Sequence, residues 1–157
     1  MTTDREPMTR VIPKEKAVFW LDRKGRWRNR HGPFEHKKII DYFHRSIERD
    51  RDGYYLFQSD GERAEKVYFA YEDTALFVFE MAEEGGAIVL TLNTGRKIAL
   101  APERLFIRGD SLYLHIGDEV ARFSDRPLMR ISGRIECRGE TYWFRAEEGM
   151  MEIPVES

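Results

Sequence analysis

The residues best suited to binding chemistry lie in the basic segment RKGRWRNRH, residues 23–31. Five of its nine residues are Arg or Lys, and Trp27 stands in the middle. Guanidinium groups bind carboxylates and phosphates through paired hydrogen bonds. Three interpretations are open: an exposed hairpin tip with Trp27 packed inward, a site for an anionic or phosphorylated small molecule, or a nucleic-acid surface. The turn signal Lys24-Gly25 favours the hairpin tip.

The carboxylate pair Glu72-Asp73 has a position suited to acid–base chemistry. It lies between the β-prone runs 66–71 and 75–81, where a turn is expected. Acidic side chains in turns often bind their own backbone, which is the simpler interpretation. The alternative is that the pair lines a cleft. The later run EEGG, residues 83–86, links two expected strands, so it predicts a solvated hairpin turn and not a phosphate-binding loop.

The remaining reactive side chains are isolated in the sequence. The four histidines are spread along the chain, at His31, His36, His44 and His115. No HExxH pattern and no cysteine pair accompanies them, so converging metal ligands are not expected, and His115 is expected to be a cross-strand or core-edge residue. Cys137 precedes Arg138, but no histidine lies close to it in the sequence. We therefore expect no catalytic residue, no metal and no cofactor.

Aromatic residues occur around the expected hairpin and its neighbouring strands: Trp20, Trp27, Tyr54, Tyr55, Tyr68 and Trp143. Adjacent residues of a strand point to opposite faces, so one of each adjacent pair is expected outside. An outward ring beside Arg26 or Arg28 would suit a flat anionic ligand or a peptide, whereas inward rings would fill the core. The candidate ligand-binding residues are Arg26, Trp27, Tyr55, Glu72 and Asp73.

Two segments have the apolar spacing of amphipathic helices. In residues 34–49 the apolar positions recur at helical spacing, and Gly32-Pro33 stand at the expected helix start. In residues 124–136, Ser124 suits an N-cap and Pro127 suits the first turn. Strands are expected at 17–22, 26–28, 53–58, 66–71, 75–81, 87–93, 96–100, 105–108, 111–116, 120–123, 141–146 and 151–155. This pattern predicts an α+β fold that is rich in antiparallel strands and has two helices.

One structural unit recurs along the chain after a shift of 88 positions, which places residue 47 on residue 135. Apolar positions agree through the helix and into the aromatic strand. Residues 17–58 and 111–146 are therefore expected to be two copies of a hairpin–helix–strand unit, joined by a β-meander. The second copy has HIGDEVARF in place of RKGRWRNRH, so the feature they share is a hairpin and not a basic charge. The identical pairs are Ile47 and Ile135, Glu48 and Glu136, and Tyr54 and Tyr142.

The composition is that of one globular domain with a mixed surface charge. The chain has 157 residues, 41% of them hydrophobic and 34% charged, and its net charge is −2. Residues 1–16 are expected to form a flexible N-terminal tail and residues 17–157 a compact body. The balance of charges is +4 over residues 1–60 and −6 over residues 61–157. That asymmetry is weaker than in most nucleic-acid-binding domains.

The same composition bears on the cellular compartment. A single cysteine favours a reducing compartment. The N-terminal segment lacks the apolar run of a signal peptide, and no stretch approaches the roughly 20 apolar residues of a membrane helix. We therefore expect a cytoplasmic protein.

The run DRKGRWRNRHGPFEHKKIIDYFHRSIERDRDGYYLF resembles the bacterial domain-of-unknown-function family 1285. That family shows a turn before a tryptophan, then an amphipathic helix, then an acidic–Gly–Tyr–Tyr/Trp–Leu strand. The corresponding segments here are 24–27, 34–49 and 52–56. Segments KVYFAYEDTALFV, LTLNTGRKIAL and SLYLHIGDEVARFSDRPLMRIS resemble later parts of the family, so the likeness covers residues 17–146. The end departs from it, because GETYWFRAEEG and MEIPV stand where the family has a Trp- and Gly-rich stretch ending in Phe-Pro-Leu.

The resemblance implies a compact α+β fold with a repeated motif, no established enzymatic activity, and a role suggested in signal transduction. We therefore expect a non-enzymatic binding module for a small molecule or a protein partner, with its cleft between the two repeated units. One alternative is an enzyme acting on a small anionic substrate, with Glu72 or Asp73 as base and Arg26 as anion clamp. A second is a nucleic-acid binder that uses residues 23–31, although the charge balance argues against it. An edge strand near 141–146 could also pair with a second copy of the chain.

Overall fold

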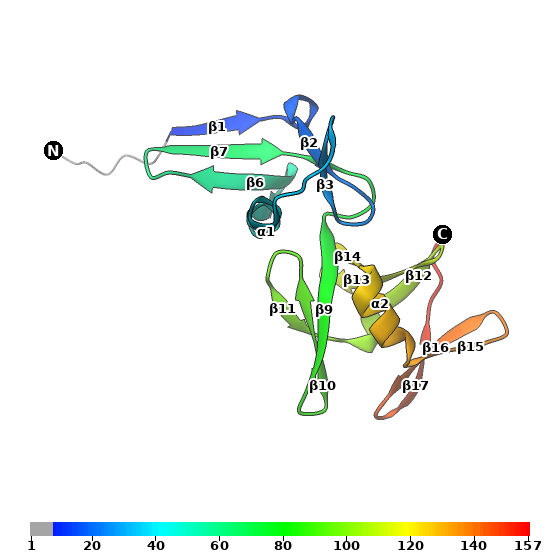
Figure 1. Cartoon of the computed structure of the whole chain (residues 1–157). Coiled ribbons are helices and arrows are strands. Elements are labelled where there is room, and N and C mark those ends of the chain that lie inside the picture. The colour runs from blue at the N-terminus through cyan, green and yellow to red at the C-terminus, as the bar shows by residue number, and fades with distance from the viewer. Residues whose placement is uncertain (1–7) are drawn as a thin grey trace. The chain divides into compact units, whose positions relative to one another are not determined.

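The computed structural model describes residues 8–157 and divides the chain after Asp73 into two compact units. The N-terminal unit contains strands β1–β8 and helix α1, and the C-terminal unit contains strands β9–β17 and helix α2 (Figure 1). Strands dominate, and most neighbouring strands are antiparallel. The predicted α+β class is therefore confirmed.

The N-terminal unit is built from two four-stranded sheets. In the first, β5, β6 and β7 are antiparallel and β1 joins the edge of β7 in parallel. In the second, β2 and β3 form a hairpin, β4 extends it, and β8 pairs with β2 in parallel. The first sheet has the order β1 (Met8–Ile12), β7 (Arg63–Tyr68), β6 (Gly53–Ser59) and β5 (Ile47–Asp50); the second has the order β4 (Gly32–Pro33), β3 (Trp27–Asn29), β2 (Phe19–Leu21) and β8 (Ala70–Tyr71).

The structure differs from the expected flexible tail over Met8–Lys16, which forms β1 and the short 3-10 helix η1 (Lys14–Lys16). The edge of β7 supplies the backbone partners, with Met8 opposite Arg63 and Ile12 opposite Val67. This partner lies more than fifty residues away in the sequence, so the short run MTRVI carries only a weak strand signal of its own. Residues 1–7 of the expected tail lie outside the described residues.

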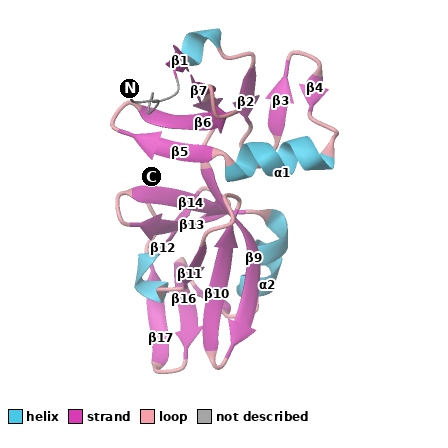
Figure 2. Cartoon of the chain, turned by 90° about the vertical axis from the view of Figure 1, so that its left-hand side faces the viewer, coloured by secondary structure: helices cyan, strands magenta, loops and turns pink. Residues whose placement is uncertain are grey.

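Helix α1 (Lys37–Arg45) is shorter than the helix expected over residues 34–49. Gly32–Pro33 forms β4 instead of the helix start, and the chain turns at Ser46 into β5. Ile47 continues the apolar spacing of the helix, but its backbone pairs with Leu56 of β6, and strand pairing outweighs the local pattern. Figure 2 shows α1 beside β3 and β5. Its buried residue is His44, whereas Ile39, one of the apolar residues at helical spacing in 34–49, is 46% exposed.

The C-terminal unit contains a six-stranded sheet and a three-stranded sheet. In the larger one β14 pairs with β9 in parallel and every other pair is antiparallel. The larger sheet has the order β11 (Lys97–Ala99), β10 (Ala87–Leu92), β9 (Leu76–Glu84), β14 (Glu119–Phe123), β13 (Ser111–Ile116) and β12 (Leu105–Arg108). The smaller has the order β15 (Ile135–Arg138), β16 (Thr141–Ala146) and β17 (Gly149–Ile153).

Helix α2 (Asp125–Ser132) is also shorter than expected, because Ile135 begins β15 instead of extending the helix to residue 136. The helix is attached to β9 by polar contacts as well as by packing. The backbone N–H and the hydroxyl of Ser124 both donate to the carbonyl of Val78, at 3.0 and 2.8 Å, and Arg130 donates to the carbonyl of Met81. A second 3-10 helix, η2 (Pro102–Arg104), precedes β12.

The buried side chain of Asn93 fixes the start of β9. Its Oδ1 accepts from the N–H of Phe77 at 2.9 Å, and its Nδ2 donates to the carbonyl of Ala75 at 3.1 Å. A buried backbone group is costly when it lacks a hydrogen-bond partner. The Asn93 side-chain amide supplies such partners to the backbone of β9 where strand pairing ends nearby. The core of the unit is apolar, with Phe77, Val78, Leu90, Leu92, Leu105, Leu114 and Phe123 fully or almost fully buried.

Each unit holds one of the two segments that the sequence predicts as copies. Helices α1 and α2 begin at Lys37 and Asp125, and strands β5 and β15 begin at Ile47 and Ile135. Both pairs of starts are 88 positions apart. A hydrogen bond also recurs at this spacing: Phe57 N–H donates to the Ser46 carbonyl at 3.1 Å, and Arg145 N–H to the Arg134 carbonyl at 2.8 Å. That the two segments superimpose stays a prediction.

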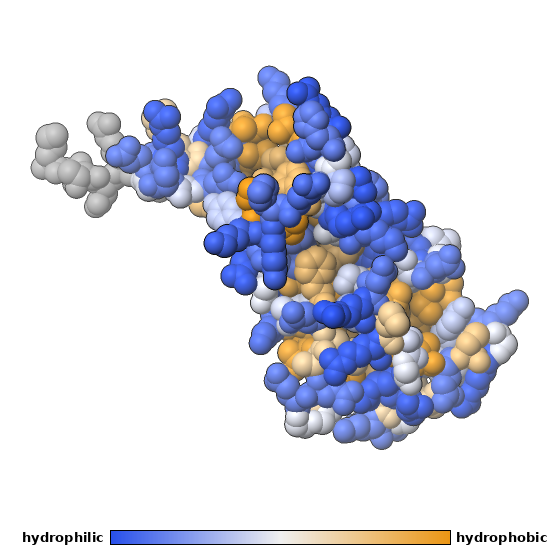
Figure 3. Space-filling view, viewed as in Figure 1, coloured by the Kyte–Doolittle hydropathy of each residue, from blue (hydrophilic) through white to orange (hydrophobic). Residues whose placement is uncertain are grey.

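Hydrophilic residues cover most of the face drawn in Figure 3, with hydrophobic residues showing in smaller patches. None of the described helices has the length and hydropathy needed to cross a membrane.

Candidate functional site

The basic segment forms the turn between β2 and β3. The N–H of Asp22 donates to the carbonyl of Arg26 at 2.9 Å, and the N–H of Gly25 donates back to the carbonyl of Asp22 at 3.0 Å. Gly25 has a φ of 78°, which a residue without a Cβ adopts at little cost. The segment is therefore a tight hairpin, and its side chains are presented from a fixed backbone.

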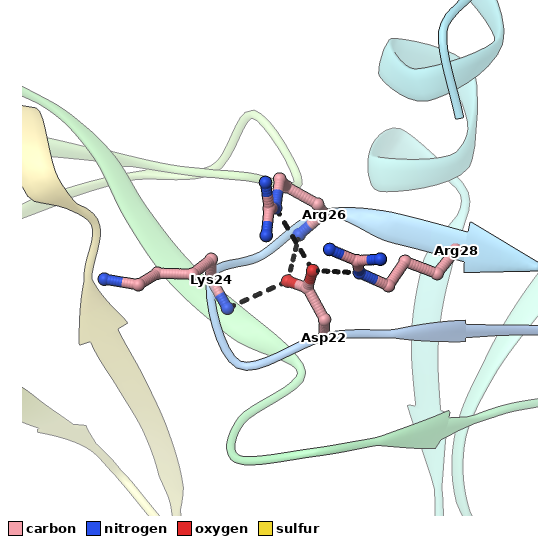
Figure 4. A network of polar contacts seen from close by, with 4 residues as sticks. All are labelled: Asp22, Lys24, Arg26 and Arg28. Atoms are coloured by element: carbon pink, nitrogen blue, oxygen red, sulfur yellow. Dashed lines mark hydrogen bonds and ion pairs between the residues drawn. The ribbon is translucent and has the colours of Figure 1, made fainter. Parts of the chain in front are cut away.

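The carboxylate of Asp22 is the centre of this hairpin (Figure 4). The residue is only 3% exposed, and its carboxylate accepts four hydrogen bonds. Oδ1 accepts from the backbone N–H groups of Lys24 and Arg26, both at 2.9 Å. Oδ2 accepts from Nε of Arg26 at 3.1 Å and from Nε of Arg28 at 2.6 Å. Burial raises the pKa of Asp22, but the hydrogen bonds from Arg28 and the turn outweigh it and hold the pKa below its usual 3.8.

Asp22 holds two guanidinium groups by one nitrogen each and leaves their outer ends open. The side chain of Arg26 is 56% exposed and that of Arg28 is 29% exposed. Within residues 8–157, the terminal Nη nitrogens of both groups have no hydrogen-bond acceptor in the protein. Arg23 and Arg30 lie exposed on the same hairpin. The hairpin therefore presents two oriented guanidinium groups within a larger excess of positive charge.

We expect Asp22→Asn to lower the free energy of unfolding by about 2 kcal/mol, because hydrogen bonds to a charged group contribute about 1.5–3 kcal/mol each. Urea unfolding at neutral pH measures it, with Asp52→Asn as an exposed control of the same chemistry. The loss should shrink in acid, because a carboxyl with a lowered pKa stabilises the fold above its unfolded pKa and loses that effect as the pH falls below it. Equal stability of the two variants at neutral pH would contradict the role of Asp22.

Trp27 faces away from this surface and lies in the core of the N-terminal unit. It is 1% exposed, and its ring centroid lies 4.9 Å from Phe69, 5.4 Å from Phe43 and 5.7 Å from Phe19. Its indole N–H donates to Nδ1 of His44 at 3.2 Å. Trp27 thus packs the hairpin onto the core, as the hairpin-tip interpretation predicts. Its buried ring is not accessible to a ligand.

Tyr55 lies in the other sheet, where a polar cluster uses its ring. The ammonium of Lys66 lies 4.3 Å from the ring centroid and 2.8 Å from Asp50 Oδ2, and the hydroxyl of Tyr68 donates to the same oxygen at 2.6 Å. The Tyr55 hydroxyl donates to Glu48 at 3.1 Å. The hydrogen bonds from Lys66 and Tyr68 lower the pKa of Asp50 to about 2. The chain's own lysine therefore occupies the aromatic surface that Tyr55 would offer a ligand.

The acidic pair follows β8, the strand next to β2. The backbone N–H of Glu72 donates to the carbonyl of Leu21 at 2.9 Å, which places Glu72 beside the residue that precedes Asp22. The Glu72 side chain is exposed and that of Asp73 is half-buried. Of the five candidate residues, Arg26 thus lies in the β2–β3 turn, and Glu72 and Asp73 directly follow β8, the strand paired with β2. Trp27, on β3, is buried in the core, and Tyr55 lies in the other sheet.

Two residues that organise the site, Asp22 and His44, are not among the candidate ligand-binding residues that the sequence suggests. An Asp directly before a Lys-Gly turn is a signal for a side chain that binds turn N–H groups, and it could have identified Asp22. His44 follows Ile40 by four positions, so it falls on the same helix face. Burial lowers the pKa of His44 to about 4, against a smaller raising effect of the Asp41 charge.

The other reactive side chains take structural positions. Within residues 8–157 no three His, Cys, Asp or Glu side chains come together in a way that could hold a metal ion. His115 stacks on Phe106, with ring centroids 4.3 Å apart, and lies 3.3 Å from a carboxylate oxygen of Glu156. Its half-buried place confirms the expected core-edge role. The exposed thiol of Cys137 lies 3.3 Å from the carbonyl of Gly139.

The chain matches a family model, DUF2944, with the description "Protein of unknown function (DUF2946)", over residues 10–156. Two crystal structures share its fold. A DUF1285 family protein from Silicibacter pomeroyi DSS-3 is 16% identical with a TM-score of 0.60, over 94% of this chain and 83% of that one. A DUF1285 family protein from Shewanella baltica OS155 is 16% identical with a TM-score of 0.51, over 74% and 91%. No protein of curated function matches the chain. The predicted likeness to family 1285 is confirmed, and at this identity it concerns the fold.

Proposed function

Since the chain belongs to the DUF2944 family of proteins of unknown function, we propose a function from its own side chains: a non-enzymatic binding module that recognises an anionic small molecule through the β2–β3 hairpin. The role suggested for the resembling family, signal transduction, suits such a module. Binding of the anion would be the signal, and no bond in the ligand would need to change.

The observation that carries this proposal is the orientation of Arg26 and Arg28 by one buried carboxylate. A long arginine side chain loses conformational entropy when it binds a ligand, and a side chain that is already held loses less. Because Asp22 takes only the Nε–H of each arginine, the Nη nitrogens remain as donors. Paired donors of this kind match the geometry of phosphate and carboxylate groups.

The electrostatics of the hairpin support an anion in the same place. Residues 23–30 carry five positive charges, four from arginines and one from Lys24, whereas Asp22 and the neighbouring Glu72 and Asp73 supply three negative charges. The net charge of the hairpin remains positive after the ion pairs of Arg26 and Arg28 with Asp22 are counted. An anion of one or two charges would therefore meet attraction without having to displace Asp22, which the turn holds from its own backbone.

The test is calorimetric titration of the whole chain with two probes, inorganic pyrophosphate and adenosine monophosphate, at low salt. We expect binding to the unmodified protein and at least roughly tenfold weaker binding to Arg26→Gln and to Arg28→Gln, since each removes charge-assisted hydrogen bonds. Arg51→Gln is the matched control, because Arg51 is an exposed arginine in the turn between β5 and β6.

Two results would overturn the proposal. One is the absence of binding heat with either probe at low salt. The other is an equal loss of affinity in Arg51→Gln, which would mean that the anion responds only to net charge. A short single-stranded oligonucleotide is the third probe. If it binds more tightly than both small anions and its affinity falls steeply with salt, the hairpin is a nucleic-acid surface instead.

A further inference from the structure

The C-terminal unit carries an open groove of about 470 Å³ that the anion site does not involve. We call it the apolar groove and define it by the side chains of Ile88, Leu100, Phe144, Met150 and Met151. Ile88 is on β10, Leu100 directly follows β11, Phe144 is on β16, and Met150 and Met151 are on β17. Its volume lies in the range of ligand sites, roughly 300–1,000 Å³.

Three carboxylates line the same groove: Glu103 on η2, and Glu147 and Glu148 in the turn between β16 and β17. All three are exposed. Within residues 8–157 none of them has a basic side chain at ion-pair distance. The one arginine at the groove, Arg134, is 2.7 Å from Glu83 and is therefore already compensated. The groove thus combines an apolar surface with uncompensated negative charge.

The carboxylate of Glu147 lies against the turn of the neighbouring hairpin. A Cβ atom on Gly86, in the turn between β9 and β10, would lie 3.2 Å from Oε1 of Glu147. The missing side chain at Gly86 therefore lets this carboxylate lie against the turn, at one end of the groove. An acidic group at the end of an apolar surface favours a ligand with an apolar side chain followed by a basic one.

The two methionines suit a peptide more than a rigid small molecule. Met150 is half-buried and Met151 is exposed at the groove. Methionine has three rotatable bonds and a polarizable sulfur, so it adapts to apolar side chains of different shapes and is frequent on peptide-binding surfaces. A stretch of peptide would cover these side chains and place lysines or arginines against the three carboxylates.

We propose that the apolar groove binds a basic peptide segment of a partner protein, with apolar side chains on the floor and Lys or Arg beside Glu103, Glu147 and Glu148. Charge complementarity selects this occupant, because the three carboxylates would repel an anionic lipid surface or a nucleic acid. The proposal stands independently of the anion site, which lies in the other unit.

The test uses the whole chain with methyl-labelled methionine and three synthetic dodecapeptides. The first alternates leucine with lysine, the second leucine with glutamate, and the third serine with lysine. We expect only the leucine–lysine peptide to bind and to shift the methyl signals of Met150 and Met151. The signal of Met129, which is 78% exposed on α2 outside the groove, should stay in place.

Removing the charges of the three carboxylates should weaken this binding by roughly tenfold, since three exposed ion pairs with the peptide, each of modest strength, are lost together. The variant is Glu103→Gln, Glu147→Gln and Glu148→Gln in one chain. Its matched control is Glu15→Gln, Glu62→Gln and Glu140→Gln, which changes the net charge equally at exposed positions away from the groove. The control should bind as the unmodified protein does.

Equal binding of the leucine–lysine and leucine–glutamate peptides would overturn the proposal, as would equal weakening in the control variant. Binding of the leucine–lysine peptide without a shift of the Met150 and Met151 signals would also overturn the proposal. If those two signals shift with protein concentration in the absence of peptide, the groove is a contact between two copies of the chain, and the proposed partner is wrong.

Discussion

Trp27→Ala is expected to lower the free energy of unfolding of the N-terminal unit by about 4 kcal/mol. Replacing a buried tryptophan or phenylalanine by alanine costs about 3–5 kcal/mol, because apolar contacts are lost and a cavity remains. Trp27 is 1% exposed and has ring contacts with Phe19, Phe43 and Phe69. The substitution also leaves Nδ1 of the buried His44 without the indole donor, which adds to the loss.

Urea unfolding followed by tryptophan fluorescence measures this effect when Trp143→Phe is the background. The chain then has only Trp20 and Trp27, both in the N-terminal unit, and Trp20 remains as the reporter in the alanine variant. Trp27→Phe is the control, since it keeps an aromatic ring in the cluster and should lose less than half as much stability. A loss below about 1 kcal/mol in Trp27→Ala would show that the ring is not part of the core.

The second large effect is a loss of stability as the pH falls from about 6.5 to about 4. Burial lowers the pKa of His44 to about 4, while Asp41 raises it by a smaller amount, and the unfolded value is 6.5. Between these two values the unfolded chain binds a proton that the folded chain does not, so acid favours unfolding. The full difference corresponds to about 3 kcal/mol at 1.36 kcal/mol per pKa unit. Well above pH 6.5, the unfolded value, His44 should no longer make the free energy of unfolding depend on pH.

The measurement is the free energy of unfolding between pH 7.5 and pH 4, compared with the same series for His44→Gln. Glutamine can accept the indole N–H through its carbonyl oxygen and does not titrate, so most of the slope in this window should disappear. His36→Gln, an exposed histidine directly before α1, should keep the slope. The lowered pKa values of Asp22 and Asp50 contribute only at the acidic end of this window, below about pH 5, and they do so equally in both proteins. An unchanged slope in His44→Gln would contradict the assignment.

Strands whose pairing partners adjoin them in sequence could be predicted closely. The sequence predicts strands at 111–116 and 141–146, and β13 and β16 have those bounds. Both are short β-prone runs beside Gly-containing turns, Gly117-Asp118 after the first and Gly139-Glu140 before the second, so the local pattern contains the information. The parallel edge strand β1 could not be found in the same way, because its strand partner β7 begins at Arg63.

Helix ends were predicted less well, for one physical reason. Ile47 and Ile135 each continue the apolar spacing of the preceding helix, so local periodicity extends both helices through them. In the structure both residues begin strands, and their backbones pair with Leu56 and Phe144. Such pairing is a tertiary interaction that the helical pattern of a single segment does not contain.

At the candidate site, residue type identified the donors but not the groups that orient them. Arg26 could be chosen because guanidinium chemistry is visible in the sequence. The role of Asp22 depends on two backbone N–H groups of the turn and on its burial, which arise only in the folded chain. The sequence suggests Trp27 and Tyr55 as rings for a ligand, yet Trp27 packs against the chain's own residues and Tyr55 against Lys66.

The most direct test of the anion site is an NMR titration that observes the arginine Nε–Hε signals as inorganic pyrophosphate is added at low salt. The proposal predicts saturable shifts of the Arg26 and Arg28 signals, which bond to Asp22, and no comparable shift of Arg51. It also predicts that Asp22→Asn weakens the response, because the guanidinium groups are then no longer held. If the Arg26 and Arg28 signals stay in place, or move only as much as that of Arg51, the hairpin is not an anion-binding site.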